Sequence, residues 1–318
     1  MEDETKDQGK RTESTTWRVP EGAPVRLDAF VRLSLPHLSA RRIKVLIEEK
    51  SCLINGREAK KGSMLFPGDS VVFCGDPRYL AQAPISFDGQ VPILFEDNAL
   101  LAVDKPSGLA THGHSGKDDA TLANYLLGMR PALLGVGHSR WEPGLLHRLD
   151  RDTSGVVLVA KQQKVFEVVR RQFVARTVGK FYRAIVQGKM PARGSVDYSL
   201  AHDPVDRRKM CHLPSAGGAS GKNWTALTHF RTLGWGPGYS HVEIRIETGV
   251  THQIRVHLRA IGHPIVGDPL YGDPGAAEPR CLLHASRLEL AHPVESQRLR
   301  IESSLPLEFN GFETGPGP

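Results

Sequence analysis

The chain has 318 residues, enough for one large domain or two smaller ones, and 41 Lys and Arg against 35 Asp and Glu give a formal charge of +6. This mildly basic balance permits an anionic partner without requiring one. With no apolar run near the ~20 residues that cross a bilayer, no signal peptide and no CxxC pair among the four cysteines, we expect a cytoplasmic, membrane-free protein with reduced thiols. We also expect a monomer, since the sequence indicates no exposed apolar patch.

The first part of the chain divides into an arm and a small module. Residues 1–20 are polar and aperiodic, which predicts a disordered arm. Residues 21–78 show helical apolar spacing before and after Ser39, a suitable N-cap, and then short strands around the turn Asn55-Gly56. With "INGR" and "PGDSV", this pattern resembles the S4 domain, a small RNA-binding module.

The second predicted helix of this module is basic. Arg41, Arg42 and Lys44 interleave with its apolar residues. Such a charged stripe is usually a solvated helix face. Within an S4-like module we instead predict that these three side chains contact RNA.

A linker and a larger domain follow. Residues 79–90 lack periodicity and contain proline and glycine, which indicates a linker. In residues 91–318, strand-like and helix-like runs mix without a regular βαβ order, which predicts an α+β fold with a mainly antiparallel sheet. The runs with the clearest pattern are strands at 100–103, 156–160, 183–186 and 242–246 and helices at 163–174 and 253–260.

Several common catalytic motifs are absent from the sequence. It has no phosphate-binding loop, no G-x-S-x-G elbow and no H-E-x-x-H zinc motif. Its histidines lack ligand spacing, since His252 and His257 are five positions apart and lie on different sides of a helix. We therefore predict no metal site.

The segment "HRLDRDTSG", residues 147–155, places Asp150 at the start of an apolar run. A charged turn that satisfies local backbone donors explains Thr153 and the residues after it. It does not explain Asp150, because a carboxylate at the edge of a buried strand is costly without a paired cation. Such a pair would keep the carboxylate charged and able to act as a nucleophile or base.

A second charged segment, "TGVTHQIRVHLRA", begins a helix for which Thr251 is a plausible N-cap. The helix is expected to expose Arg255 and Arg259 on one face. Ile254 and Leu258 would pack inward. Between the two segments, Tyr182 in "KFYRAIVQG" offers a flat ring near the start of a strand.

These segments occur in one order, and together they resemble the RluA-type family of RNA pseudouridine synthases. The resemblance covers about residues 91–305 and implies isomerisation of uridine without cofactor or metal, in a central RNA-binding cleft of a sheet domain flanked by helices. The matching segments are "ILFEDNALLAVDKPSGL", "HRLDRDTSGVVLVAK", "KFYRAIVQG", "TGVTHQIRVHLRAIGHPIVGDPLYG" and "LLHASRLELAHP".

The resemblance also implies roles for five residues. Asp150 would act on the ribose, as a nucleophile at C1′ or a base at C2′, with Arg255 as its cationic partner. Tyr182 would stack on the target base and assist proton removal from C5, and Ile254 would form an apolar floor under it. Arg148 would enter the stack from which the nucleotide has swung out.

One position departs from the family pattern, because Val250 stands where an arginine is usual. Loss of a phosphate contact there would weaken RNA binding or change the substrate. The S4-like module favours large-subunit rRNA over tRNA as the partner, although tRNA stays open. Two other hypotheses are a catalytically idle RNA-binding or ribosome-assembly factor and a hydrolase that uses Asp150 and Asp152 as a carboxylate pair.

Overall fold

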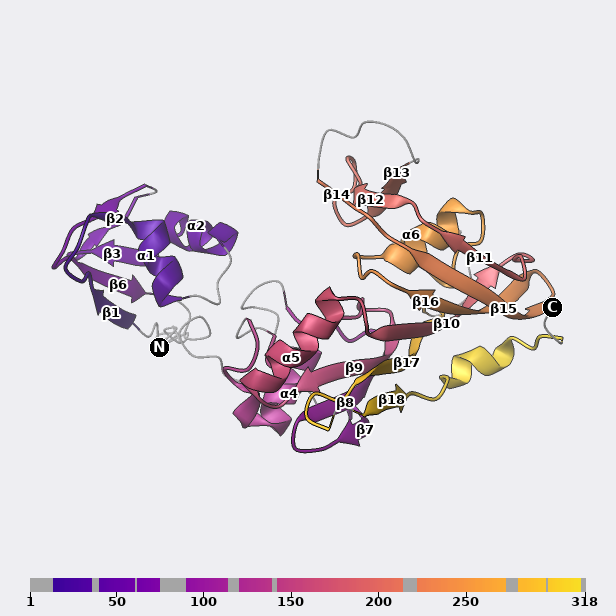
Figure 1. Cartoon of the computed structure of the whole chain (residues 1–318). Helices are drawn as coiled ribbons and strands as arrows, with labels where there is room; N and C mark the ends of the chain where they lie inside the picture. The colour runs from indigo at the N-terminus through magenta and orange to yellow at the C-terminus, as the bar shows by residue number, and fades with distance from the viewer. Residues whose placement is uncertain are drawn as a thin grey trace, which may run out of the picture. The chain divides into compact units, whose positions relative to one another are not determined.

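The structure is a computed structural model that describes residues 14–35, 40–60, 62–74, 90–113, 120–138, 142–213, 222–272, 280–295 and 297–315. The described chain forms two compact units, the first built from residues 14–74 and the second from nearly all described residues after 90 (Figure 1). Over the described ranges, no helix is both long and apolar enough to cross a membrane.

The first unit combines two short helices with two small antiparallel sheets. Helices α1 (Leu27–Ser34) and α2 (Ala40–Glu48) bury Leu27, Val31 and Ile43 against the strands. The main sheet has the order β1-β6-β3-β4, and β2 pairs with β5. The strands are β1 (Ser14–Arg18), β2 (Val25–Arg26), β3 (Cys52–Ile54), β4 (Arg57–Glu58), β5 (Met64–Leu65) and β6 (Ser70–Cys74).

The predicted hairpin turn lies between β3 and β4. Asn55 and Gly56 both have positive φ values, 50° and 79°, as a two-residue hairpin turn requires. The Asn55 side chain donates to Asp69 Oδ1 and accepts from the Ser70 amide, both at 2.8 Å. These bonds hold the turn against the start of β6. The expected N-cap Ser39 lies outside the described residues.

The prediction of a disordered arm is wrong for part of residues 1–20. Residues Ser14–Arg18 form β1, which pairs antiparallel with β6. The ring centroid of Trp17 lies 6.2 Å from the ring centroid of the buried Phe73. Because the residues of this stretch are mostly polar, the sequence did not indicate a strand here. The stability of this edge strand comes from cross-strand pairing rather than from its own hydrophobicity.

The second unit is organised around a nine-stranded sheet with the order β11-β15-β16-β10-β17-β9-β8-β7, and β18 pairs with β17. Only β9 and β17 run parallel among these neighbours. The α+β fold class with a mainly antiparallel sheet is therefore confirmed. The strands are β7 (Ile93–Glu96), β8 (Leu100–Lys105), β9 (Ser154–Ala160), β10 (Gly179–Gln187), β11 (Arg193–Val196), β15 (Thr228–Gly236), β16 (Tyr239–Ile246), β17 (Leu283–Ala291) and β18 (Arg298–Glu302).

Helices cover the sheet at two hydrophobic clusters. Helices α4 (Leu122–Met129) and α6 (Gln253–Ala260) pack against one cluster, and α5 (Gln163–Val174) packs against another beside β9 (Figure 1). Short 3-10 turns follow α4 and β18, at Pro131–Leu133 and Leu307–Gly311. A separate three-stranded sheet, β13-β12-β14, joins β12 (Ser199–His202), β13 (Met210–Leu213) and β14 (Asn223–Trp224).

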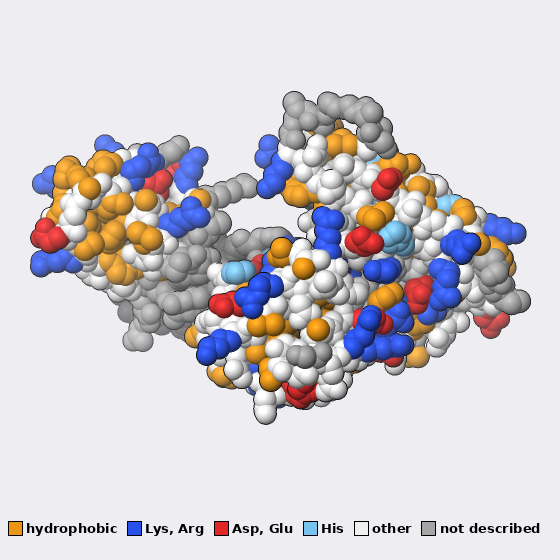
Figure 2. Space-filling model, in the orientation of Figure 1, with side chains coloured by type: hydrophobic (Ala, Val, Ile, Leu, Met, Phe, Trp, Pro, Cys, Tyr) orange, Lys and Arg blue, Asp and Glu red, His pale blue; other side chains and the backbone are white. Residues whose placement is uncertain are grey.

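The surfaces of the two units differ in composition. On the visible face of the first unit, hydrophobic side chains are surrounded by Lys and Arg (Figure 2). Leu33 and Phe66 of this unit are 77% and 57% exposed. On the visible face of the second unit, basic and acidic side chains are interspersed (Figure 2). A preference for anionic ligands there has to come from particular cavities rather than from the whole face.

Candidate active site

The loop before β9 carries Asp150, and hydrogen bonds from a distant segment fix its backbone. Thr111 Oγ1 donates to the Leu149 carbonyl at 2.7 Å and accepts from the Leu149 amide at 3.1 Å. Ser107 Oγ donates to the Asp152 carbonyl at 2.8 Å. Because the backbone is held at Leu149 before Asp150 and at Asp152 after it, the position of the Asp150 side chain is well defined.

Lys105, at the end of β8, braces the same loop from the interior. Its fully buried ammonium donates to the carbonyls of Pro106 at 2.9 Å, Leu109 at 2.7 Å and Arg151 at 3.1 Å. Burial lowers the pKa of Lys105 to about 7, while two nearby carboxylates favour its charged form. Lys105 therefore ties the end of β8 to the loop of Asp150.

Arg255 of α6 is the cation nearest to Asp150. Its Nη1 lies 3.3 Å from Asp150 Oδ2, although the two residues are 105 positions apart in the sequence. The expectation of an exposed Arg255 is wrong, because only 2% of the residue is exposed. Its guanidinium can be buried because Nε and Nη2 also bind both oxygens of Asp268, each at 2.7 Å.

Asp268 anchors this arrangement and was not identified from the sequence. It is buried and also accepts hydrogen bonds from the amides of Leu270 at 2.9 Å and Tyr271 at 3.1 Å. Burial opposes its charge, but Arg255 and these amides bring the pKa of Asp268 below its ordinary value. Burial would likewise lower the pKa of Arg255, yet Asp268 raises it above its ordinary range. The signal in the sequence was the Asp-Pro pair in a Gly-rich loop, which favours an Asx-type turn.

All five residues that the family resemblance singled out in this domain line one small cavity of about 90 Å³. Tyr182 on β10 and Ile254 on α6 are 8% and 5% exposed. Burial, and then the nearby charge of Asp150, raise the pKa of Tyr182 well above its ordinary value. Arg148 is exposed at the rim. The cavity thus combines a carboxylate, a guanidinium, a neutral phenol and an apolar side chain.

His252 also approaches Asp150, and sequence reasoning gave it no role in the site. Its Nε2 lies 3.9 Å from Asp150 Oδ2, and its Nδ1 lies 2.8 Å from the Tyr271 hydroxyl. His252 rather than Thr251 is the N-cap of α6, and its φ of 57° lies in the left-handed region. Burial lowers the pKa of His252, which favours a neutral imidazole beside the carboxylate.

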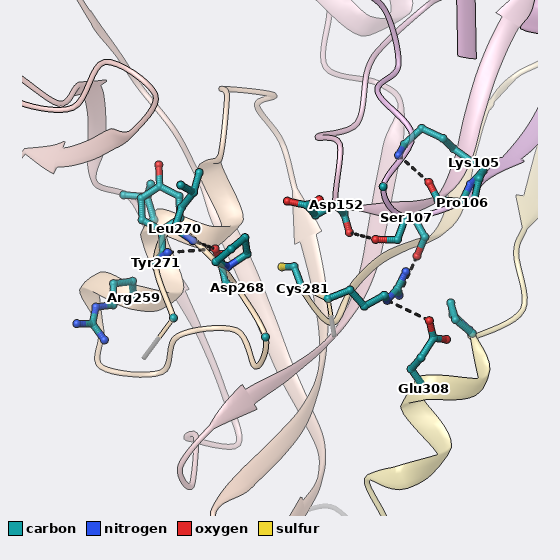
Figure 3. Close-up of a pocket in the computed structure, with 18 of the residues that line it drawn as sticks. Lys105, Pro106, Ser107, Asp152, Arg259, Asp268, Leu270, Tyr271, Cys281 and Glu308 are labelled. Atoms are coloured by element: carbon teal, nitrogen blue, oxygen red, sulfur yellow. Dashed lines mark hydrogen bonds and ion pairs between the residues drawn. The ribbon is translucent and has the colours of Figure 1, made fainter. Parts of the chain in front are cut away.

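Asp268, which holds Arg255, also lines a larger cavity of about 1550 Å³ (Figure 3). Asp268, Tyr271 and Arg259 border it on one side, facing Asp152 and Cys281 on the other (Figure 3). Asp152 lines this cavity, whereas Asp150 lines the smaller one. The two carboxylates open into different cavities, which is not the arrangement of a pair that flanks one glycosidic bond.

The described residues contain no group of three or more His, Cys, Asp or Glu side chains placed to hold a metal ion. In the first unit, the side chains of Arg41 and Arg42, predicted to contact RNA, lie outside the described part. Lys44 is exposed and lies 4.0 Å from Glu48, one helical turn away. Its contact with RNA stays a prediction.

Comparison with known proteins identifies relatives of this architecture. A family model for RNA pseudouridylate synthases matches residues 99–260. An uncharacterized RNA pseudouridine synthase of Synechocystis is 36% identical, over 90% of this chain and 87% of the relative. The ribosomal large subunit pseudouridine synthase D of Nitrosomonas europaea is 38% identical, over 91% of this chain and 83% of the relative.

Solved structures give the same assignment. The human protein "RNA Pseudouridylate Synthase Domain Containing 1" is 26% identical and has a TM-score of 0.59, over 72% of this chain and 90% of its own. Its counterpart "Domain Containing 4" is 29% identical with a TM-score of 0.54, over 69% of this chain and 90% of its own. The family match, the sequence relatives and the shared fold agree, and this chain belongs to the RNA pseudouridylate synthases, enzymes that act on RNA.

Proposed function

We propose that this enzyme isomerises specific uridines of large-subunit ribosomal RNA to pseudouridine, with Asp150 as the group that acts on the ribose. The ion pair of Asp150 and Arg255 at 3.3 Å, in a cavity also lined by Tyr182, is the observation that supports this most directly. Support for the rRNA target comes from relatives named ribosomal large subunit pseudouridine synthase D, at 38% and 34% identity.

The proposed reaction breaks the N1–C1′ bond of uridine, joins C1′ to C5, and moves one proton from C5 to N1. Substrate and product are isomers, so the reaction needs no electron donor, oxidant or transferred group. We therefore propose that it proceeds without cofactor or metal. Asp150 either attacks C1′ to form a transient ester or removes the proton from C2′, and both routes need a charged, oriented carboxylate.

Arg255 supplies that orientation in the proposed mechanism. Its guanidinium is fixed by Asp268 before the substrate arrives, so little reorganisation accompanies the reaction. Arg255 Nη1 and His252 Nε2 both approach Oδ2 of Asp150. We therefore expect Oδ1 to be the oxygen that meets the ribose.

The uracil ring is proposed to lie between Tyr182 and Ile254. A flat ring and an apolar side chain favour stacking over hydrogen bonding, so they can hold the base before and after it rotates. The phenol of Tyr182 is protonated at neutral pH, as an ordinary tyrosine is, and burial raises its pKa further. Its proposed part in proton loss from C5 is therefore to relay a proton rather than to act as a phenolate.

The remaining contacts are proposed to select the RNA. A uridine in a structured RNA has to leave its stack to reach a cavity, and the exposed Arg148 at the rim would fill the vacated position. We propose that the first unit is an S4-like RNA-binding domain, residues 21–78 with β1 added, which contacts RNA through Arg41, Arg42 and Lys44.

Mapping of pseudouridine in RNA from cells that lack the protein tests this proposal. Incubation of total rRNA and tRNA with the wild-type chain should create new pseudouridines in large-subunit rRNA, and Asp150→Asn should create none. Asp152→Asn is the matched control and should retain activity, because Asp152 lines the other cavity.

The other outcomes identify the alternatives. New sites in tRNA alone would change the proposed target. Tight, salt-sensitive binding without modification would indicate a non-catalytic RNA-binding factor. Release of free uracil would indicate a hydrolase.

A further inference from the structure

An outer cavity of about 760 Å³ adjoins the cavity of Asp150. The two share lining residues, among them Arg148, Tyr182 and Val250. A ligand in the outer cavity would therefore touch whatever group enters the inner one. Its volume falls in the range of sites that enclose a small organic molecule.

One wall of the outer cavity is basic. Arg148, Arg170, Arg176 and Lys180 line it, and Glu247 is the one acidic residue among its described lining residues. Lys180 is largely occupied, since it donates to the carbonyls of Glu247 and Thr248. Arg148 and Arg176 are exposed. Since Arg148 is proposed to enter the RNA stack, the exposed Arg176 is the guanidinium that can bind a phosphate group in bidentate fashion.

Two aromatic side chains from the three-stranded sheet also line the cavity. Trp224 and His202 lie with ring centroids 5.4 Å apart at an angle of 86°, and both line the cavity. Lys222 Nζ, on an exposed side chain, lies 5.5 Å from the centroid of the Trp224 ring. A base that stacks on Trp224 would displace this ammonium, which would then be free to meet a phosphate.

Val250 belongs to the packing that supports Trp224. It packs, with Trp224, against a cluster that contains Leu200, Met210 and Tyr271. An arginine at this position, usual in the resembling family, would place a charge against that apolar cluster. The valine therefore fits a cavity that recognises a base beside this cluster and leaves phosphate recognition to Arg176.

We propose that the outer cavity binds the nucleotide next to the target uridine in the RNA, with its base stacked on Trp224 and its phosphate on Arg176. This inference rests on the proposed function of the inner cavity. A basic groove faced by aromatic rings is the usual arrangement for single-stranded nucleic acid, because rings stack on any base while cations follow the backbone. The subsite accordingly contributes to RNA choice and affinity rather than to bond breaking.

The test uses an RNA of about 20 nucleotides around a uridine mapped with the wild-type chain. Trp224→Ala should raise the RNA concentration at half-maximal rate about tenfold, since one base–aromatic stack is lost. The single-turnover rate at saturating RNA should stay within about twofold. Trp224→Phe should recover much of the loss. Arg176→Ala should weaken binding and make the salt dependence shallower by about 0.7 in log–log slope.

Two controls separate this subsite from general effects. Arg171→Ala removes an exposed arginine beside Arg170 that does not line the cavity, and it should change nothing. The second control uses RNAs that carry one abasic nucleotide, either 5′ or 3′ of the uridine. Where the abasic site replaces the nucleotide that contacts Trp224, Trp224→Ala should no longer weaken RNA binding.

The proposed subsite would be overturned if Trp224→Ala bound RNA as tightly as the wild-type chain. It would also be overturned if this substitution weakened the binding of both abasic RNAs equally. An Asp150→Asn protein that keeps its activity would overturn the proposed function instead. The affinities measured for the Trp224 variants would still stand in that case.

Discussion

The Asp268→Asn substitution probes the buried pair that holds Arg255. Asp268 Oδ1 accepts from Arg255 Nη2 and from the amides of Leu270 and Tyr271, so the asparagine carbonyl should take this place. Its NH2 group then faces Arg255 Nε, donor against donor, where a 2.7 Å bond existed. Arg255 also loses its buried counter-charge, and removal of one partner from such a pair costs about 3–5 kcal/mol. That is a large part of a typical unfolding free energy of about 5–15 kcal/mol.

Urea unfolding of the full chain, with amide hydrogen exchange in β10 and β16 to report on the second unit, measures this loss. Isomerisation should also slow by roughly 100-fold, because Arg255 is no longer held against Asp150. Glu243→Gln is the matched control. It removes an exposed pair with Arg231 at 3.0 Å and should cost less than about 1 kcal/mol. The reasoning is refuted if Asp268→Asn loses no more stability than this control.

Three further changes test other parts of the structure. Lys105→Met removes a donor from three carbonyls, of which the buried one of Leu109 is the most costly, while that of Arg151 keeps the Gly108 amide. We expect a loss of about 1–3 kcal/mol in urea unfolding and a slower isomerisation, and an unchanged rate would contradict the bracing role. Gly155→Ala would place a Cβ 2.2 Å from the Ala285 carbonyl oxygen and should abolish stable folding, whereas Gly238→Ala, also at positive φ but with open space, should cost only about 1 kcal/mol in the same assay. Burial lowers the pKa of His284 to about 4, below its unfolded value of about 6.5. The unfolded chain therefore takes up the proton first as the pH falls. The stabilisation that neutral His284 contributes is fully present above about pH 6.5 and should decline by up to about 3 kcal/mol toward pH 4. In His284→Leu this part of the pH dependence of the urea midpoint should disappear, and an unchanged slope would contradict the assignment.

Much of the fold could be predicted from local pattern. Helices Gln163–Val174 and Gln253–Ala260 have the predicted bounds, because each shows an apolar stripe at helical spacing. The hairpin at Asn55-Gly56 was equally readable, since few other residue pairs adopt two positive φ values. Strand β1 was missed because its signal lies in its partner β6 rather than in its own sequence.

From the residues alone, without the family resemblance, the site was predictable only where a charge lacked a local explanation. Asp150 drew attention because its position demanded a cation, and the structure has Arg255 at 3.3 Å. Asp268 and His252 carried no comparable signal. Their importance arises from contacts with Arg255 and Asp150 that only the folded chain creates. The burial of Arg255 was mispredicted for the same reason, because helical spacing does not reveal a partner on another loop.

The position of β17 in the large sheet has a consequence for synthesis on the ribosome. This strand lies between β9 and β10. It therefore joins the half of the sheet that contains β9, the strand after Asp150, with the half that contains β10, the strand of Tyr182. Until residues 283–291 leave the exit tunnel, both half-sheets keep an unpaired edge, and such edges invite association between nascent chains. The enzyme is therefore expected to gain its activity only after β17 has left the tunnel, and a ribosome stalled before β17 should hold an inactive, chaperone-dependent chain.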